Sequence, residues 1–538
     1  MKDLIKKFIP SFLINFYHFS LAFLGALIYW FPAKKLKVIG VTGTNGKSTV
    51  IEMISKIFEE ASFKVASFSS IRFKIKEKIW PNTLRMTMPG RFQVQKLLRE
   101  AVNSGCQYAV LEVTSEGIKQ YRHKFINFET AAFTNLSLEH IEAHGSFEKY
   151  QKAKGKLFEA TKNIHVINID DENAEYFLQF LAKKKYTYGL NKGDINAKNT
   201  QFKLRLMGEF NIYNALAAIC VGLSQNIPLE TCKKALEKIE GIPGRMELII
   251  SEPFKVFVDY AFTPNALEKV YQTISNQQLV INNKLICVLG SCGGGRDKWK
   301  RPVLGELAAK YCDEIIVTNE DPYDENPMEI IEQVAQGTQG KAKKILERKE
   351  AIKEALKLAK ENDTIIITGK GCEPSICVGR GKKILWDDRQ VVREEFQKLK
   401  MKNEKLKFEV LEHKADLKIR AFGKTKKELF TNVLLAMSES QKGENLSPKV
   451  KREIQIKSLD LETLLVDFLS EVLYLSQVNK EIYNEVKFKK FSDTELEAEL
   501  VGQKVERFGE DIKAVTYHGL EICQRKDGTW EITILFDI

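Results

Sequence analysis

The sequence predicts an α/β protein in which a domain with a parallel sheet, a second doubly wound domain and a small α+β domain follow one another. Three observations support this prediction. An apolar run at residues 35–42 leads into a glycine turn that ends in Lys47 and Ser48. Short buried runs then alternate with helical stretches, and the pattern changes to half-buried strands after a lysine-rich linker at 398–407. A chain of 538 residues is long for one hydrophobic core, so several domains are expected.

The turn at residues 43–49 carries the clearest chemical signal. It follows a buried strand and precedes a helix, and its glycines let backbone N–H groups close around phosphate oxygens. Lys47 would supply a charge to the outer phosphates and Ser48 a ligand for Mg²⁺, although Val41 stands where the usual spacing has its first glycine. The sequence therefore predicts ATP and Mg²⁺ as cofactors. The predicted ATP-binding residues of the turn are Gly43, Thr44, Asn45, Gly46, Lys47, Ser48 and Thr49.

The composition is typical of a globular protein of the reducing cytoplasm. Hydrophobic residues make up 44% and charged residues 29% of the chain, and the net charge of +12 comes mostly from scattered lysines, which usually form a solvated face. This charge fits acidic substrates such as nucleotides or anionic lipids, and no direct nucleic-acid motif accompanies it. The nine cysteines include no Cys-x-x-Cys pair, which argues against a disulfide framework or a zinc site.

A long apolar segment precedes the phosphate-binding turn. Residues 12–31 are broken by Asn15, His18 and Ser20, and lysines flank them on both sides. Twenty such residues could cross a bilayer, but the turn follows too closely to lie outside the cell, and no small-residue cleavage site marks a signal peptide. We therefore expect residues 1–35 of a cytoplasmic protein to form a helix that lies at the inner membrane surface or against a partner.

Two groups of buried-strand patterns define two sheet domains. Strands are expected at 108–113 and 130–135 in the first group, and at 256–260, 285–290, 314–318 and 364–368 in the second. Because helical stretches separate the strands, both sheets should be parallel. The expected domains are 36–243, 244–400 and 405–538, and the last ends in a half-buried strand at 530–538.

Nine short motifs occur in an order that resembles the Mur ligase family, the ATP-dependent amide-forming enzymes of peptidoglycan precursor synthesis, and most closely its tripeptide synthetase branch. They lie at residues 43–48, 111–115, 134–140, 150–158, 208–214, 244–247, 259–261, 293–301 and 369–373. Nine motifs in the family's order make coincidence negligible. The resemblance implies that the first domain is a P-loop ATPase and the second a Rossmann-like C-terminal ligase domain that binds the amino acid.

Three residues would complete a catalytic centre around Lys47. Glu112, an acid at a strand end that faces the phosphate-binding turn, can hold Mg²⁺ together with Ser48, and His140 on the neighbouring loop can hold a second ion. Lys154 matches the lysine that the family carries as an N-carboxylated side chain, which turns a cation into a metal-binding anion.

The resemblance also implies how the rest of the nucleotide is held and what the reaction is. Asn214 matches the family's adenine contact, Asp259 its ribose contact, and Arg245 and Arg296 its phosphate-side arginines. The implied chemistry is amide formation through an acyl phosphate. A substrate carboxylate attacks the γ-phosphate of ATP, an amino acid's amine attacks the activated carbonyl, and domain closure excludes water.

The amino-acid site departs from the family pattern. The resemblance places Asp321, Tyr323, Gly369 and Glu373 around the incoming amino acid. In the family's diaminopimelate enzymes an arginine of Asp-Asn-Pro-Arg pairs with the distal carboxylate of the amino acid, and here Tyr323 takes its place. Tyrosine cannot make a bidentate carboxylate pair, so we expect lysine or another amino acid rather than diaminopimelate.

Other departures concern the muramyl-peptide substrate. Phe262 and Cys372 stand in place of histidines and Glu139 in place of an aspartate, so contacts around the substrates have been rebuilt. The family's enzyme has a uridine-binding domain ahead of its first strand, whereas residues 1–35 occupy that place here. The expected partner is therefore a nucleotide-linked muramyl-peptide, or a lipid-linked precursor held differently.

The last part of the chain resembles a second family, archease, the small activator of the RNA ligase that seals split transfer RNA. The matching segments are 408–416, 421–425, 464–465, 513–518 and 537–538. In that family a His-x-x-Asp pair and the terminal aspartate meet at a metal, which implies a divalent metal held by His413, Asp416, Asp537 and Ile538. Clustered negative charge at the chain's own carboxylate is consistent with such a cation. An RNA ligase is the implied partner.

Three functions stay open on the sequence alone. The first is an ATP-dependent acid–amino-acid ligase of cell-wall precursors whose archease-like tail assists an RNA ligase. The second is an RNA-processing cofactor in which the Mur-like part is a nucleotide-binding module. The third keeps the ligase chemistry but uses a lipid-linked acceptor or makes a polyglutamate-like product. The presence of Lys47, Glu112, His140, Lys154 and Arg245 favours an active ligase.

Overall fold

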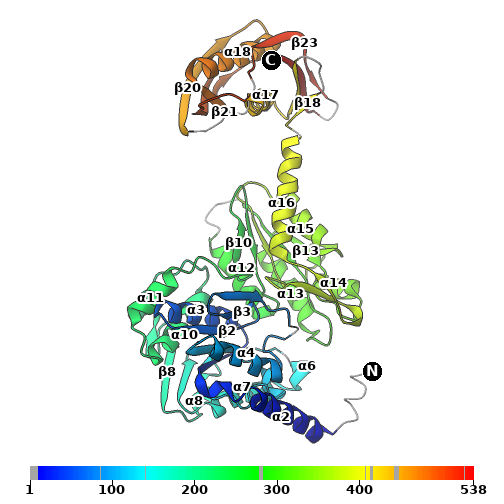
Figure 1. Ribbon diagram of the computed structural model, residues 1–538. Coiled ribbons are helices and arrows are strands. Elements are labelled where there is room, and N and C mark those ends of the chain that lie inside the picture. Colours follow the sequence, from blue (N-terminus) through cyan, green and yellow to red (C-terminus); the bar gives the residue numbers. More distant parts are fainter. Residues whose placement is uncertain are drawn as a thin grey trace. The chain divides into compact units, whose positions relative to one another are not determined.

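The chain divides into two compact units, Met1–Glu395 and Phe396–Ile538, in the computed structural model (Figure 1). The structure describes residues 10–84, 86–139, 141–277, 283–405, 407–411, 416–441, 447–509, 511–525 and 528–538. Two predicted metal ligands, His140 and His413, lie outside the described residues.

The first unit contains a nine-stranded sheet with the strand order β4-β3-β2-β5-β1-β6-β7-β8-β9. Its strands are β1 (Lys37–Thr42), β2 (Val65–Phe68), β3 (Arg72–Ile75), β4 (Lys78–Pro81), β5 (Tyr108–Glu112), β6 (Phe128–Phe133), β7 (Ile164–Asn168), β8 (Lys184–Gly189) and β9 (Ile195–Asn196). The sheet is parallel except for β3 and β4 at one edge, which pair antiparallel. The three strands predicted here are β1, β5 and β6, which lie side by side at the centre.

Helices cover both faces of this sheet. They are α3 (Lys47–Glu60), α4 (Arg91–Asn103), α5 (Ser115–Lys119), α6 (Ile141–His144), α7 (Phe147–Ala160), α8 (Ala174–Leu178), α9 (Ala197–Thr200), α10 (Glu209–Ser224) and α11 (Leu229–Glu237). Ile39 and Val41 of β1 pack in the core beneath α3, α10 and α11, whereas Val38 packs in the core beneath α4 and α7. Side chains of β1 thus alternate between two cores, as a parallel sheet buried on both faces requires.

The predicted N-terminal helix is α2 (Ser11–Ile28), and η1 (Pro32–Lys35) connects it to β1. It packs along α4. Among the residues that the structure describes, no helix combines the length and the apolar character that a membrane span needs.

A second, six-stranded sheet in the same unit has the order β10-β11-β15-β12-β13-β14. Its strands are β10 (Glu247–Ile250), β11 (Lys255–Val258), β12 (Leu285–Leu289), β13 (Glu314–Thr318), β14 (Ala342–Ile345) and β15 (Thr364–Ile367), with a separate hairpin of β16 (Ser375–Val378) and β17 (Lys382–Leu385) joined by η2 (Gly379–Gly381). Only β10 pairs antiparallel among these six strands. All four strands predicted for this sheet are present, and they are its central strands.

The helices of this second sheet are α12 (Pro264–Gln277), α13 (Lys300–Tyr311), α14 (Pro327–Gln336), α15 (Arg348–Leu358) and α16 (Asp388–Lys405). Helices α12, α13 and α14 share one core with the sheet, and α15 packs against β12, β13 and β15. The prediction of a linker at 398–407 is wrong for its first part, because α16 continues to Lys405. Lysine, glutamate and methionine are good helix formers, so this composition also suits a solvated helix.

The second unit is an α+β domain of two antiparallel sheets and two helices within the described residues. The sheets are β18-β19-β24-β23 and β20-β22-β21. The elements are β18 (Phe408–Leu411), β19 (Leu417–Gly423), α17 (Lys426–Gln441), β20 (Ser447–Lys457), α18 (Leu461–Asn479), β21 (Glu481–Phe491), β22 (Glu495–Lys504), β23 (Ala514–Gln524) and β24 (Trp530–Asp537). The predicted half-buried strand is β24, where Ile532, Ile534 and Phe536 are part of the core and alternate with more exposed residues.

Candidate active site

One cavity of about 710 Å³ collects the loops that follow the carboxyl ends of both sheets in the first unit. Its walls come from the segments after β1, β5 and β6 of the first sheet and after β11, β12, β13 and β15 of the second. Ligand sites of parallel α/β sheets form at these strand ends. The predicted site residues that line the cavity are Thr44, Asn45, Gly46, Lys47, Ser48, Thr49, Glu112, Asn214, Arg245, Asp259, Arg296, Asp321, Tyr323, Gly369 and Glu373.

The glycine turn has a shape that side chains would not allow. Gly43 and Gly46 have φ of +150° and +83°. A Cβ on Gly43 would overlap the Thr134 hydroxyl oxygen, and one on Gly46 would overlap the Asn214 amide oxygen. The turn is also held from outside, because Asn45 N donates to the Asn135 side chain at 2.9 Å. The result is a rigid backbone loop ahead of the N-terminus of α3.

A hydroxyl and a carboxylate meet directly behind the turn. Ser48 Oγ donates to Glu112 Oε2 at 2.8 Å, and the backbone N–H of Ser70 donates to the same oxygen at 2.8 Å. Lys47 Nζ lies 3.8 Å from Glu112 Oε1 and donates to Thr44 O at 2.8 Å. Burial lowers the pKa of Lys47, although Glu112 opposes that shift. Oxygen donors of this kind are the ligands that Mg²⁺ prefers.

Lys154 lies beneath the turn rather than on the surface. Its side chain is buried, and Nζ donates to Gly43 O at 2.6 Å. The ammonium also sits 4.6 Å from the centre of the Tyr150 ring, and the Tyr150 hydroxyl is 3.1 Å from Thr44 Oγ1. Burial holds the pKa of Lys154 well below its usual range, and the charge of Lys47 adds to that shift. A buried amine of lowered pKa is more readily neutral and nucleophilic.

The residues predicted to contact the adenosine and phosphates have partners of their own. Asn214 Nδ2 donates to Asn211 Oδ1 at 3.1 Å. Asp259 is buried and accepts the backbone N–H groups of Met246 and Ala261 at 2.7 and 2.6 Å, while burial raises its pKa. The Arg245 guanidinium lies 4.5 Å from the centre of the Tyr260 ring, which orients it toward the cavity wall.

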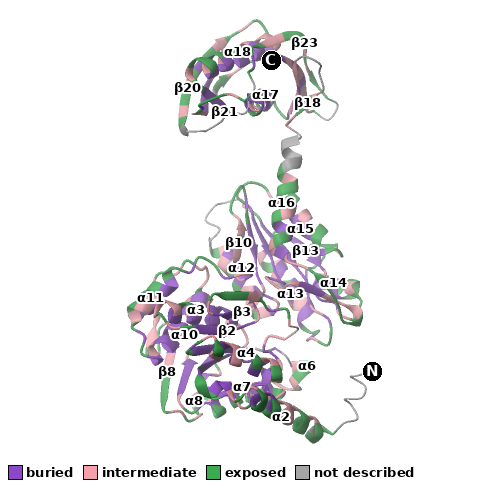
Figure 2. Cartoon of the chain, viewed as in Figure 1, coloured by how far each residue is buried: buried purple, intermediate pink, exposed green. Residues whose placement is uncertain are grey.

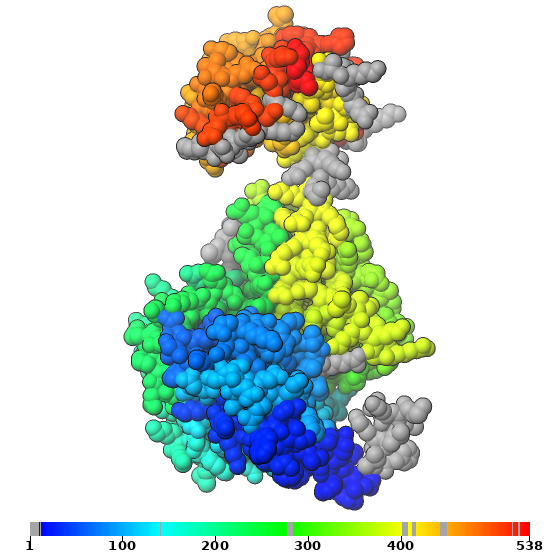
Figure 3. Space-filling view, viewed as in Figure 1, coloured from blue at the N-terminus to red at the C-terminus, as the bar shows by residue number. Residues whose placement is uncertain are grey.

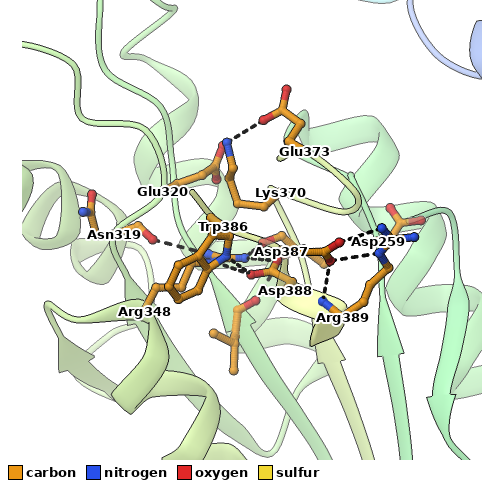
Figure 4. Close-up of polar contacts among 12 residues, drawn as sticks. Asp259, Asn319, Glu320, Arg348, Lys370, Glu373, Trp386, Asp387, Asp388 and Arg389 are labelled. Atoms are coloured by element: carbon orange, nitrogen blue, oxygen red, sulfur yellow. Dashed lines mark hydrogen bonds and ion pairs between the residues drawn. The ribbon is translucent and has the colours of Figure 1, made fainter. Parts of the chain in front are cut away.

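The opposite end of the cavity is built around Lys370. Its Nζ donates to both oxygens of Asp321, at 3.0 and 2.9 Å. It also donates to Glu373 Oε2 at 2.5 Å, a contact shown in Figure 4. Glu373 Oε1 accepts a hydrogen bond from the Tyr260 hydroxyl at 2.8 Å. Tyr323 has φ of +52°, and burial raises its pKa to about 12. These contacts hold Asp321 and Glu373, two residues predicted to bind the amino-acid substrate. The lysine that holds them was not singled out from the sequence.

A buried arginine supports the loops that carry this end of the site. Arg348 pairs with Asp388 through two hydrogen bonds, at 2.8 and 2.7 Å, and donates to Thr368 O at 2.7 Å (Figure 4). Trp386 Nε1 donates to the same carboxylate at 2.7 Å. The pair therefore ties the end of β15, just before Gly369, to the start of α16.

Loops from the two sheets meet beside the cavity. The backbone N–H of Glu142 donates to Asp297 Oδ1 at 3.0 Å, and that of Lys298 donates to Glu142 Oε1 at 3.0 Å. These contacts join the segment that follows β6 to the segment before α13. Arg296, a predicted phosphate contact, is part of the second segment and lines the cavity.

Comparison with known proteins identifies the family. Three family models match the chain: the Mur ligase middle domain over residues 41–222, the Mur ligase glutamate ligase domain over 244–371 and the archease protein family over 408–538. The UDP-N-acetylmuramoyl-L-alanyl-D-glutamate--2,6-diaminopimelate ligase 1 of Clostridium acetobutylicum is 37% identical over 403 residues, which cover 71% of this chain and 82% of that protein. The chain belongs to the Mur ligase family.

Further relatives and solved structures agree with this assignment. The UDP-N-acetylmuramyl-tripeptide synthetase of Roseiflexus sp. is 34% identical over 428 residues, 72% of this Mur ligase and 83% of that protein. MurF from Acinetobacter baumannii has the same fold, with a TM-score of 0.52 at 20% identity over 65% of this chain and 77% of its own. The folylpolyglutamate synthase of Mycobacterium tuberculosis complexed with ADP and AMPPCP has a TM-score of 0.52 at 17% identity, over 65% and 92% of the two chains.

This Mur ligase is therefore an ATP-dependent amide ligase of peptidoglycan precursor synthesis, and residues 408–538 form an archease domain. The family implies ATP and Mg²⁺, and the residues present fit both. The glycine turn leaves room that a Cβ would fill, and Ser48 and Glu112 offer a hydroxyl and a carboxylate behind it. Mg²⁺ held there would neutralise charge on the phosphates.

In the archease domain of this Mur ligase, two of the predicted metal ligands lie at the same end of the four-stranded sheet. Leu417 of β19 pairs with Phe536 of β24, so Asp416 and Asp537 lie at the same end of neighbouring strands. The side chain of Asp537 is exposed, and Lys513 Nζ donates to Ile538 O at 2.9 Å. Within the described residues, which exclude His413, no cluster of three or more His, Cys, Asp or Glu side chains could hold a metal.

Several residues of the site escaped sequence reasoning. Ser70, Asn135 and Lys370 hold the predicted residues in place but match no expected role. Lys370 could have been found, because it lies inside the motif at 369–373. Ser70 gave no signal, since its position after β2 becomes important only when β2 lies beside β5.

Proposed function

We propose that this Mur ligase joins an amino acid without a distal carboxylate, lysine first among them, to a UDP-N-acetylmuramyl-peptide or a related cell-wall precursor. In this proposal, residues 1–35 are the N-terminal helix segment and residues 36–243 are the ATPase domain. Residues 244–400 are the amino-acid-binding domain, and residues 405–538 are the archease-like domain. The observation that carries it is the single cavity in which the phosphate-binding turn, with Lys47, and the amino-acid loops, with Tyr323 and Glu373, face the same space. An acyl phosphate formed at one end of such a cavity can meet an amine held at the other.

Each residue has a proposed role in that reaction. Lys47 and Arg245 face charge that develops on the transferring phosphoryl group, and Ser48 and Glu112 hold Mg²⁺. The acceptor's carboxylate oxygen attacks the γ-phosphorus and ADP leaves. The amine then attacks the acyl carbon and loses a proton, and phosphate departs with the former carboxylate oxygen. Lys154 is the proposed site of N-carboxylation, supported by its burial and lowered pKa.

The proposed amino acid rests on Tyr323. An arginine at this position could bind a distal carboxylate with two parallel hydrogen bonds, and a tyrosine hydroxyl cannot. The Clostridium relative is named as a diaminopimelate ligase, which makes diaminopimelate the competing candidate. Asp321, Gly369 and Glu373 are the proposed contacts of the common α-amino-acid part and the side-chain ammonium.

A substrate panel tests the proposal. The full chain, Mg-ATP and UDP-N-acetylmuramyl dipeptide are incubated with lysine, ornithine, diaminopimelate or glutamate. Mass spectrometry identifies each product and measures its rate of formation. Lysine should give the highest kcat/KM. Equal or better use of diaminopimelate would contradict the role given to Tyr323, and the absence of product from UDP-N-acetylmuramyl dipeptide with every amino acid would favour the third function.

We further propose that residues 408–538 assist an RNA ligase and use a divalent metal at Asp416, Asp537 and Ile538, with His413. The family match and the position of Asp416 and Asp537 at the same end of the sheet support this second activity. Addition of the full chain should accelerate RNA joining by an RNA ligase of the kind that seals split transfer RNA. Asp537→Asn should abolish the acceleration and leave amide ligation intact, whereas an unchanged acceleration would refute the metal site.

We also propose that residues 12–31 make a peripheral contact with the inner membrane surface. The exposure of large apolar side chains on α2 supports this contact. Co-sedimentation of the full chain with lipid vesicles tests it, and a chain that stays in the supernatant with every lipid would exclude it.

A further inference from the structure

Helix α2 presents a large exposed apolar face. Ten large apolar side chains in or next to it are more than 40% exposed, including Phe16 at 69% and Trp30 at 82%. These residues are Phe12, Leu13, Phe16, Tyr17, Phe19, Phe23, Leu24, Leu27, Ile28 and Trp30. Figure 3 shows this segment in dark blue on the surface of the first unit, and Figure 2 shows exposed positions along it. Apolar patches of this kind mark an interaction surface.

The opposite side of α2 is fixed to the protein, so the direction of the apolar face is set. Ala22, Gly25 and Ala26 are buried, and a Cβ on Gly25 would lie 3.2 Å from Arg91 O. Arg99 donates to Tyr29 O at 2.9 and 2.6 Å. Small residues thus allow close packing on α4, and the larger side chains of the helix are left outside. A mostly apolar helix that is packed on one side only leaves apolar surface for a further contact.

Several lysines lie beside the face. Residues 4–51 contain no aspartate or glutamate. Lys34, Lys35 and Lys37 are exposed just beyond Trp30, and Lys124 is exposed beside Phe125, whose ring lies 5.3 Å from that of Phe19. Exposed aromatic rings flanked by lysines are typical of helices that lie in the headgroup region of an anionic bilayer.

The face also adjoins the rim of the catalytic cavity. Leu84, Met86 and Thr87 line the cavity and lead directly into α4, on whose first turn α2 rests. Arg122, another lining residue, follows Tyr121, whose ring is 6.4 Å from that of Phe19. A surface that covers α2 therefore comes close to Leu84, Met86 and Thr87.

We propose that the outward face of α2, with Lys34, Lys35 and Lys124, docks the ligase on an anionic lipid bilayer and places the rim of the catalytic cavity beside the headgroups. This inference rests on the peripheral contact proposed above and adds the lipid charge, the binding residues and the consequence for substrate access. A precursor carried on a membrane lipid would reach the cavity without leaving the surface.

Vesicle binding tests the inference. The full chain is sedimented with phosphatidylcholine vesicles and with vesicles that also contain phosphatidylglycerol, at low and high salt. Binding should require the anionic lipid and weaken with salt. Lys34→Gln/Lys35→Gln should weaken binding on the order of tenfold, and Phe16→Ser/Trp30→Ser should weaken it at least as much. Leu181→Ser, at another exposed apolar side chain, 80% exposed, is the matched control and should change nothing.

The outcomes separate the two proposals. No binding to any vesicle would refute the peripheral contact itself, and equal binding to neutral and anionic vesicles would refute only the charge-dependent docking. A dimer in solution that Phe16→Ser/Trp30→Ser dissociates would show that a second copy covers the face instead. Unfolding temperature and Mg-ATP binding, measured for every variant, confirm that each one is folded.

Discussion

Lys300 Nζ lies 2.7 Å from Glu139 Oε1, and this ion pair joins the two sheet domains of the ligase across 161 residues of sequence. Both side chains are buried, with 2% and 3% exposed. Burial raises the pKa of Glu139, although Lys300 opposes the shift. The Lys300 ammonium also lies 5.0 Å from the centre of the Phe262 ring. Glu139 and Phe262, which the resemblance identified as departures from the family pattern, thus contact the same ammonium group.

Removal of the lysine should weaken this junction strongly. Lys300→Met leaves the Glu139 carboxylate buried without a partner, and we expect a loss of about 3–5 kcal/mol in the free energy of unfolding. Chemical denaturation of the first unit measures it. Lys298→Met is the control, because Lys298 is 57% exposed and its pair with Glu325 should contribute about 0–1 kcal/mol. Equal effects of the two substitutions would contradict a structural role for the buried pair.

Lys47 should be needed for turnover. Lys47→Ala removes the charge that faces the transferring phosphoryl group, and we expect ADP release to fall by at least about a hundredfold. Calorimetry with Mg-ATP and a coupled ADP assay measure binding and turnover separately. Lys56→Ala, on the exposed side of the same helix at 48% exposure, should match the wild type. ADP release by the Lys47 variant at the wild-type rate would contradict this role, and a biological activity that Lys47→Ala leaves intact would favour the RNA-processing alternative.

Lys154 should carry a carboxyl group in the active enzyme. Its lowered pKa makes a larger fraction of the amine neutral near pH 7 than for a surface lysine, and the neutral amine is the form that reacts with CO₂. Removal of CO₂ should therefore lower the rate, and bicarbonate should restore it. A ¹³C signal from labelled bicarbonate should disappear in Lys154→Ala and persist in Lys156→Ala, at an exposed neighbour. A signal unchanged by Lys154→Ala would exclude this site.

Tyr323 should control the choice of amino acid. Tyr323→Arg restores a guanidinium that can pair with a distal carboxylate, so kcat/KM for diaminopimelate should rise relative to lysine by about 10- to 100-fold. Competition between the two amino acids, followed by mass spectrometry of the product, measures the ratio. Tyr323→Phe is the control and should leave the ratio nearly unchanged. A wild type that already prefers diaminopimelate would overturn the assignment.

The sequence was most informative where function depends on strand ends. The turn after β1 and the acid at the end of β5 could be predicted to meet, because parallel strands place their carboxyl ends at one edge. The amphipathic pattern of β24 likewise predicted Ile532 and Ile534 in a core. In each case a local pattern and a general rule of sheet packing were enough.

The remaining contacts depend on tertiary packing that no local pattern encodes. In the sequence, Lys300 cannot be told apart from the other lysines, and only the fold brings it to Glu139. Arg348 likewise pairs with Asp388, which lies 40 residues away on another helix. Lys154 was placed by the family resemblance and not by its surroundings, which only the structure describes. The metal roles of His140 and His413 stay predictions.

If the cavity forms an acyl phosphate, an oxygen atom of the acceptor carboxylate must leave on phosphate. The full chain turns over Mg-ATP, lysine and a UDP-N-acetylmuramyl dipeptide whose acceptor carboxylate carries ¹⁸O. Mass spectrometry of the released phosphate should find one ¹⁸O atom per phosphate formed with amide product, because the carboxylate oxygen leaves on phosphorus. Amide product accompanied by unlabelled phosphate, or ADP release that needs neither acceptor nor amino acid, would contradict the account.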